Sequence, residues 1–234
     1  MLMDLHAHSQ GISRCCKIDG KDMVVLTKNT GMDGVVLTNH YDKSYLINGD
    51  AKEFAERYVN EYYYVKESAK NLDFKVFFGV EVTLAKHNNV HMLVYGVEPE
   101  FVLKYPNLFD YTLEELFTLV HDHKGILIQA HPLRKGINVL LDLNYLDGVE
   151  VNCHPLYDET HLDFLATLAK DNKLILSCGG DFHNDTHRPK CGVYLSDEIN
   201  DSLELVDYLK QASTIKLCVQ EVGEFNAFDY LYHK

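Results

Sequence analysis

The sequence predicts a single α/β domain built on parallel strands, and three observations lead to this prediction. Short apolar runs rich in β-branched residues alternate with longer segments of helical period, which is the pattern of successive strand and helix units. The chain has 234 residues, enough for one large core but too few for two comfortable α/β domains. No internal repeat, low-complexity tract or Pro/Gly-rich linker interrupts the pattern, so we expect one domain over residues 1–234.

The individual elements follow from the same pattern. Strands are expected at residues 2–7, 34–40, 74–83, 90–97, 125–131, 147–153 and 173–181, with weaker candidates at 191–195 and 214–219. Helices are expected near 20–31, 50–71, 112–123, 158–172 and 201–211. The last residues, about 212–234, are expected to form a docked tail.

The charge balance is acidic, with 22 Lys and Arg against 35 Asp and Glu and a formal net charge of −13. This balance argues against binding to duplex nucleic acid or to an anionic membrane through surface charge. A cluster of acidic residues can instead hold divalent cations, which would make the local potential attractive to an anionic substrate.

Composition and cysteine usage favour a cytoplasmic protein. We find no basic leader followed by an apolar run at the N-terminus and no apolar stretch long enough to span a bilayer. The six cysteines are scattered, with no C-x-x-C pair. We therefore expect reduced thiols, most of them packed in the interior.

Polar side chains stand at the ends of the predicted strands. His6 and His8 share one face of the first strand, because the side-chain period of a strand is two. The other strands end in His40, Glu81, His131, Glu150 with Asn152, and Asp181 with His183. The carboxyl ends of the strands in a parallel α/β barrel meet at one rim, so we expect these residues in one pocket. Asp4 is expected to orient one of the paired histidines.

Six short motifs occur in an order that resembles the PHP (polymerase and histidinol phosphatase) family. They are "DLHAHS" at 4–9, "LTNHY" at 37–41, "GVEVT" at 79–83, "HMLVYG" at 91–96, "AHP" at 130–132 and "GGDFH" at 179–183. The resemblance covers the chain from residue 4 to about 195. It implies a distorted TIM-like (β/α)7 barrel with two or three divalent metal ions that hydrolyses phosphoric ester bonds.

The resemblance also implies a ligand set. His6, His8, Glu81 and Asp181 would hold one ion, Glu81 would bridge to a second ion completed by His91 and His131, and His40 with His183 would help to hold a third. Nitrogen donors with a bridging carboxylate suit Zn²⁺, Mn²⁺ or Fe better than Mg²⁺ or Ca²⁺.

One departure from the family pattern leaves the third ion open. Three-metal members often carry a further histidine after the H-x-H pair, where this chain has Arg14 and Cys15. Cys15 could serve as a thiolate ligand and Asp19 as a carboxylate ligand. Equally, the loop could carry two packed or idle thiols.

The expected mechanism uses a metal-bridging hydroxide held by Glu81 and Asp181, with His183 or a metal-bound water protonating the leaving alkoxide. Only four arginines are present, and Arg14, Arg134 and Arg188 each follow a motif closely. Guanidinium groups match phosphate oxygens bidentately, so these three are expected to bind the substrate phosphate. Arg134 is therefore counted with the catalytic residues.

The substrate expected from these observations is a small phosphorylated metabolite, with histidinol phosphate as one candidate because the family includes enzymes for it. Several alternatives stay open: a 3′–5′ exonuclease or nucleotide phosphodiesterase, a phosphotyrosine phosphatase, C–N bond hydrolysis as in amidohydrolases, and a non-catalytic metal-binding module. A nucleic-acid substrate is disfavoured because no run of Lys and Arg with interleaved aromatic residues forms a basic groove. The oligomeric state is open.

Overall fold

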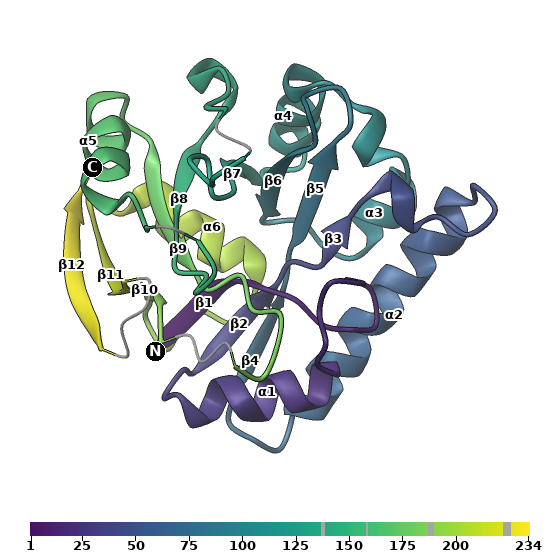
Figure 1. Ribbon diagram of the computed structural model, residues 1–234, viewed down its shortest axis with the longest axis horizontal. Helices are drawn as coiled ribbons and strands as arrows, with labels where there is room; N and C mark the ends of the chain where they lie inside the picture. The colour runs from purple at the N-terminus through teal and green to yellow at the C-terminus, as the bar shows by residue number, and fades with distance from the viewer. Residues whose placement is uncertain (137–138, 158, 187–189, 222–225) are drawn as a thin grey trace.

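A computed structural model describes residues 1–136, 139–157, 159–186, 190–221 and 226–234. Arg188, one of the three arginines expected to bind phosphate, lies outside these ranges. The described residues form two six-stranded sheets with helices around them (Figure 1).

The first sheet contains the N-terminal and C-terminal strands. Its order is β12 (Ala227–His233), β11 (Thr214–Gln220), β10 (Gly192–Tyr194), β1 (Leu2–Ala7), β2 (Gly34–Leu37) and β4 (Lys75–Phe78). The second sheet has the order β3 (His40–Tyr41), β5 (Val80–Leu84), β6 (Val90–Tyr95), β7 (Ile126–Gln129), β8 (Gly148–Asn152) and β9 (Ile175–Gly179).

The two sheets meet at two places. Thr38 and Asn39 separate β2 from β3, and Gly79 separates β4 from β5, so one parallel pair of strands continues from the first sheet into the second. At the second place β9, an edge strand of the second sheet, approaches β1 inside the first sheet, and Ala7 forms an isolated parallel bridge with Phe182, just after β9. The carboxyl ends of β1, β7, β8 and β9 therefore lie near one another, as Figure 1 shows.

The sequence expectation of a parallel barrel is only partly met. The fold is mixed α/β, and among the described residues no continuous hydrogen-bonded barrel closes, because an isolated bridge rather than a ladder joins the sheets near β1 and β9. Strand β6 is also antiparallel to both β5 and β7. The physical reason is the connection at 85–89, which suffices for a hairpin but is too short for the crossover that a parallel pair requires.

The helices lie outside the sheets, and four of the six described α-helices begin at a polar side-chain cap. They are α1 (Gly20–Asn29), α2 (Ala51–Ala69), α3 (Glu100–Lys104), α4 (Leu113–Asp122), α5 (Leu162–Asp171) and α6 (Ser202–Gln211). Short 3-10 helices cover Lys43–Tyr45, Leu108–Asp110 and Leu143–Tyr145. The side chains of Asp19, Asp50, Thr112 and Asp201 accept backbone N–H groups at the starts of α1, α2, α4 and α6. These caps satisfy donors that the first helical turn leaves unpaired.

The C-terminal segment is more regular than a docked tail. Strands β11 and β12 pair in register from Thr214 with His233 to Gln220 with Ala227, and they extend the first sheet. The strand at 227–233 was not expected from the sequence, because "AFDYLYH" mixes apolar and polar residues without a clean alternation. It lies at the edge of the sheet, where both its faces are largely exposed.

Apolar side chains pack on both faces of the strands, and a polar cluster interrupts this core at the strand ends. His6, His8 and Glu81 are completely buried there. Buried polar groups of this kind require specific partners. All six cysteines are unpaired, five of them buried and Cys15 exposed. Among the described residues, the helices are too short or too polar to cross a membrane.

Candidate metal centre

The structure brings together the eight side chains that the family resemblance proposes as metal ligands. His6 lies in β1 and His8 follows it; His40 begins β3; Glu81 and His91 lie in β5 and β6; His131 follows β7; Asp181 and His183 follow β9. Local backbone geometry aims two of them, because Asp181 and His131 have φ values of +50° and +31°. Such strained conformations of non-glycine residues are concentrated at functional sites.

Glu81 is at the middle of the cluster. Its Oε1 atom lies 3.2 Å from His6 Nε2, 2.9 Å from His91 Nδ1 and 3.2 Å from His131 Nε2. Its Oε2 atom lies 2.5 Å from His40 Nδ1 and 3.5 Å from His8 Nε2. One carboxylate therefore faces five imidazole rings, three from within strands β1, β3 and β6 and two from just after β1 and β7.

Asp181 supplies a second carboxylate to the same cluster. Its Oδ1 atom lies 3.1 Å from His8 Nε2, 3.2 Å from His183 Nδ1 and 3.5 Å from His6 Nε2. Its Oδ2 atom accepts a hydrogen bond of 2.7 Å from the hydroxyl of Tyr157. His6 and His8 thus lie between the two carboxylates.

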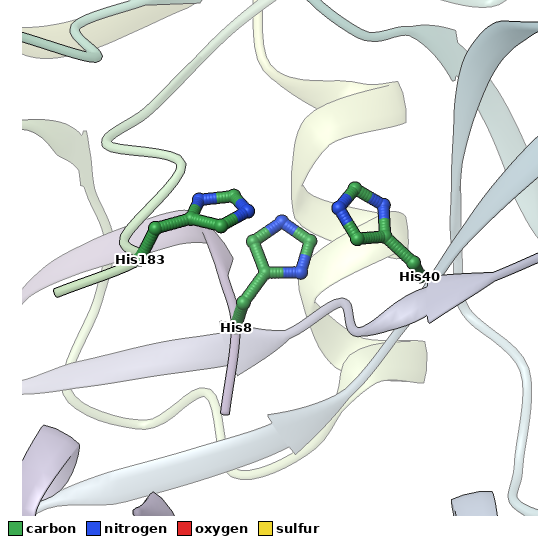
Figure 2. A group of neighbouring side chains, drawn as sticks. All are labelled: His8, His40 and His183. Atoms are coloured by element: carbon green, nitrogen blue, oxygen red, sulfur yellow. The ribbon is translucent and has the colours of Figure 1, made fainter. Parts of the chain in front are cut away.

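Figure 2 shows the outer part of the cluster, where the rings of His8, His40 and His183 stand side by side. The centroid of the His8 ring is 4.4 Å from that of His40 and 4.4 Å from that of His183. One ligand nitrogen of each ring lies within 4.8 Å of the others. His40 and His183 are slightly exposed, so this part of the cluster opens toward solvent.

Glu150 determines which nitrogen of His6 is free. Its Oε1 atom is 2.8 Å from His6 Nδ1, while its Oε2 atom accepts the His131 backbone N–H and the amide of Asn152. A carboxylate accepts hydrogen bonds, so His6 donates from Nδ1. In the neutral ring, Nε2 then directs its lone pair toward Glu81 and Asp181.

A similar relay orients His8. The hydroxyl of Ser13 donates a hydrogen bond to Asn39 Oδ1 at 2.8 Å. Because its proton is used there, Ser13 Oγ accepts a hydrogen bond from the Nδ1–H of His8 at 3.0 Å. Asn39 is held in turn by donating from Nδ2 to Ser9. The Nε2 lone pair of His8 therefore also faces the two carboxylates.

These contacts fit a bound cation. Lone pairs of neutral imidazoles repel carboxylate oxygens at 3.1–3.5 Å unless a proton or a metal ion lies between them. Five buried atoms of the cluster also lack a hydrogen-bond partner among the described residues: His6 Nε2, His8 Nε2, His40 Nδ1, Glu81 Oε2 and Asp181 Oδ1. Such unsatisfied groups are costly, and metal ligation would satisfy all five.

The electrostatics of the metal-free cluster agree with this fit. Burial raises the pKa of Glu81, but the neighbouring His40, His91 and His6 outweigh it and hold that pKa well below its usual range. Burial lowers the pKa of His40, but the charge of Glu81 outweighs it and raises the pKa to about 10. Without metal ions, protons on imidazoles therefore supply the positive charge that the carboxylates require.

Asp4 has a role different from the expected one. Its Oδ1 atom accepts the backbone N–H groups of His6 and Gly180, and no hydrogen bond joins it to an imidazole nitrogen of the described residues. Burial raises the pKa of Asp4 to about 7. Asp4 therefore ties β1 to the loop before Asp181, while Glu150 holds the ring of His6.

Tyr157 is a site residue that the sequence did not reveal. Besides its bond to Asp181, its ring stacks on His154 at 4.5 Å and meets the ring of His131 edge-on at 5.8 Å. His154 also lies near the cluster, because one of its ring nitrogens is within 4.8 Å of ligand atoms of Asp181 and His183. Nothing in "NCHPLY" marks the tyrosine, because its contact with Asp181 spans 24 residues of sequence.

Arg14 and Arg134 were both expected to bind phosphate, and both lie within the described residues. Each stands beside the cluster with its guanidinium group over a tyrosine ring. The guanidinium carbon of Arg134 is 4.8 Å from the centroid of Tyr157, and that of Arg14 is 4.8 Å from Tyr45. Arg14 also donates to the Ser44 carbonyl at 3.0 Å. Neither arginine belongs to the eight-residue cluster; each contacts a tyrosine that borders it.

Solved structures share this fold. A two-domain protein from Bacteroides vulgatus ATCC 8482, described as containing a predicted PHP-like metal-dependent phosphoesterase, is 12% identical with a TM-score of 0.63, covering 100% of this chain and 86% of that chain. A proposed metal-dependent phosphoesterase from Bifidobacterium adolescentis ATCC 15703 is 15% identical with a TM-score of 0.56. The match covers 89% of this chain and 95% of that chain. An amidohydrolase from Chromobacterium violaceum, solved with bound sulfate and no metal, is 16% identical with a TM-score of 0.54. The match covers 89% of this chain and 97% of that chain.

Sequence comparison alone adds nothing to these likenesses: no family model matches the chain, and no curated protein matches it significantly. The structural likenesses show that the chain shares its fold with solved proteins described as PHP-like or as metal-dependent phosphoesterases.

Proposed function

We propose that this protein is a metal-dependent phosphoesterase that hydrolyses phosphate monoesters of small molecules. The observation that carries the proposal is the buried cluster in which the Nε2 lone pairs of His6 and His8 face the carboxylates of Glu81 and Asp181. The phosphoesterase fold of the solved neighbours supports the same reaction class. Histidinol phosphate is a candidate substrate.

The residues of the chain would divide the work of binding metal. Glu81 would be shared between ions, because imidazoles approach both of its oxygens. Asp181 would contribute Oδ1 while Tyr157 holds Oδ2 in place. When bound, divalent ions lower the pKa of water, orient phosphoryl oxygens and neutralise developing charge. The nitrogen-rich donor set favours Zn²⁺, Mn²⁺ or Fe, in two or three copies.

The remaining groups would act on the substrate. When no ion occupies the outer part of the cluster, His183, which is partly exposed at its edge, would donate a proton to a leaving alkoxide. The sign of its charge suits this role, because Asp181 and Cys15 outweigh the effect of burial and raise the pKa of His183 to about 11. Arg134 would bind phosphate oxygens from its place over Tyr157.

Hydrolysis of a C–N bond is the second candidate, because the amidohydrolase neighbour has the same fold. The arginines near the cluster favour the phosphoester, since a neutral amide has no group that requires a guanidinium partner. A phosphodiester or nucleic-acid substrate would meet a chain of net charge −13, which disfavours long polyanions.

The test is hydrolysis by protein reloaded with Mn²⁺ or Zn²⁺, on a panel of phosphomonoesters that includes histidinol phosphate, a phosphodiester, single-stranded DNA and an N-acyl amino acid. Asp181→Ala is the inactive variant, and Asp122→Ala, at an exposed position on α4, is its control. Monoester turnover that disappears only in Asp181→Ala supports the proposal. Cleavage of the amide or the diester alone would replace it, and inactivity with metal bound would indicate a binding module.

A further inference from the structure

Cys15 stands apart from the other five thiols because it is exposed and lies against the metal centre. Its Sγ atom is 3.1 Å from His183 Nε2 and 4.0 Å from the hydroxyl of Tyr45. The other nitrogen of His183, Nδ1, is 2.7 Å from the Asp181 carbonyl. His183 therefore presents one nitrogen to Asp181 and the other to the thiol.

The backbone holds Cys15 in this position. The N–H of Lys17 donates to the carbonyl of His183 at 2.8 Å, which ties the loop after β1 to the loop after β9. The thiol of the adjacent Cys16 donates to the carbonyl of His8 at 3.5 Å. The loop is thus fixed to His8 and His183, and Cys15 directly precedes the two residues that anchor it.

The imidazoles beside the thiol show independently that a ligand belongs here. His8, His40 and His183 each place a nitrogen within 4.8 Å of the others, as the facing rings in Figure 2 indicate. His8 is completely buried, and its Nε2 atom has no hydrogen-bond partner among the described residues. Three imidazoles that converge on one space, with a thiol at its edge, form a set of donors typical of Zn²⁺.

We propose that Cys15 binds a metal ion as a thiolate, together with His40 and His183, at the outer part of the centre. The inference rests on the metal-binding part of the proposed function. Glu81 and Asp181 provide oxygen to the inner part, whereas the outer part combines sulfur with nitrogen. Thiolate ligands favour Zn²⁺ and Co²⁺ over Mn²⁺ and Mg²⁺, so the outer position selects a softer ion than the inner ones accept.

Cobalt spectroscopy tests this assignment without reference to turnover. The full chain, freed of metal and kept reduced, is titrated with Co²⁺ while the near-ultraviolet band of sulfur-to-cobalt charge transfer and the visible ligand-field bands are followed. The variants are Cys15→Ser and Cys15→His. Cys16→Ser serves as the matched control, because Cys16 is the adjacent thiol and its buried side chain bonds only to backbone carbonyls in the described structure.

We expect the sulfur band in the unaltered protein and in Cys16→Ser, and its complete loss in both Cys15 variants. Cys15→Ser should bind one equivalent of Co²⁺ fewer, whereas Cys15→His should recover that equivalent with nitrogen. Visible bands that persist in every variant show that the inner positions, and hence the fold, are intact.

A sulfur band unchanged in Cys15→Ser, or cobalt bound without any sulfur band, would overturn the inference. Absence of cobalt binding would overturn both the inference and the proposed function. A normal sulfur band in a protein that hydrolyses no substrate would remove the proposed function alone.

Discussion

The Nε2 atom of His6 lies 3.2 Å from Oε1 of Glu81, and both side chains are completely buried. Because Glu150 accepts a hydrogen bond from the Nδ1–H of His6, the Nε2 atom of the neutral ring carries a lone pair, and this lone pair faces an anionic oxygen. The arrangement is stable only with a positive charge between the two atoms. A metal ion supplies that charge when the centre is loaded, and a proton supplies it otherwise.

Replacing Glu81 should damage the centre more than any other single change. In Glu81→Gln the charge that faces five imidazoles is lost, so metal affinity should fall by more than the ~10–100-fold typical of an outer carboxylate. Bound metal is counted by elemental analysis after dialysis at fixed free Zn²⁺. The exposed Glu56→Gln is the control, and equal metal content in both variants would contradict the role given to Glu81.

Ser13 should influence metal binding although it is not itself a proposed ligand. Ser13→Ala removes the acceptor that keeps the His8 proton on Nδ1, and we expect metal affinity to fall by about 10–100-fold. Competition with a chromophoric chelator measures the affinity. Ser68→Ala, a change on α2 distant from the centre, should leave it unaltered. Unchanged affinity in Ser13→Ala would show that the relay through Asn39 does not matter.

Metal binding should release protons at pH 8. The pKa values of His40 and His183 are raised to about 10 and about 11 in the metal-free protein, so both rings are protonated at this pH and must lose protons to ligate. Affinity should therefore fall as pH decreases. Calorimetric titrations with Zn²⁺ in two buffers of different ionisation enthalpy measure the release, and identical binding enthalpies would rule it out.

The same shifts predict how the metal-free protein responds to pH. A histidine with a folded pKa of about 10 and an unfolded pKa of about 6.5 stabilises the fold fully below pH 6.5, and this contribution is lost as pH rises through 10. The free energy of unfolding should decrease from pH 7 to pH 10 without metal and change less with Zn²⁺ present. Urea unfolding across this range checks the expectation, and equal slopes with and without Zn²⁺ would refute it.

Arg134 and Tyr157 should have separable kinetic effects. Arg134→Ala should raise KM for a phosphomonoester by about 10–100-fold, the range of a lost charged hydrogen bond. Tyr157→Phe keeps the ring beneath the guanidinium but removes the donor to Asp181, so it should lower kcat with little change in KM. Steady-state kinetics on one monoester decide the matter. A change in KM alone for Tyr157→Phe would assign that hydroxyl to the substrate rather than to Asp181.

Gly179 should resist substitution because it lets β9 approach β1. A Cβ atom there would lie against Cβ of His6 and 2.8 Å from Glu150 Oε1. Gly179→Ala should therefore reduce the free energy of unfolding by about 1–3 kcal/mol and lower metal affinity. At Gly11 the three atoms nearest to the added Cβ all belong to the carboxyl end of the Glu61 side chain, which can rotate away, so Gly11→Ala should cost less by the same denaturant measurement. Equal losses would argue against close packing at Gly179.

Much of the centre could be predicted because its residues follow a local rule. His6, Glu81, His131 and Asp181 each stand in or just after an apolar run, and strand ends that share a sheet edge meet in space. The contacts of Glu150 and Ser13 were not predictable at this level. Both act by setting the proton position on another ring, which depends on contacts over 144 residues for Glu150 and on the orientation of Asn39 for Ser13.

The sequence by itself determined most of the element order and the excess of acidic residues, because periodicity and residue chemistry are local properties, whereas the eight clustered donors followed from the ordered motifs that resemble the PHP family. Only the tertiary structure decided that β6 runs antiparallel, that the sheets meet at a bridge, and that Tyr157 reaches Asp181. It also placed Cys15 against His183 across 168 residues. These outcomes depend on loop length and on distances between distant segments, and no local pattern of side chains encodes them.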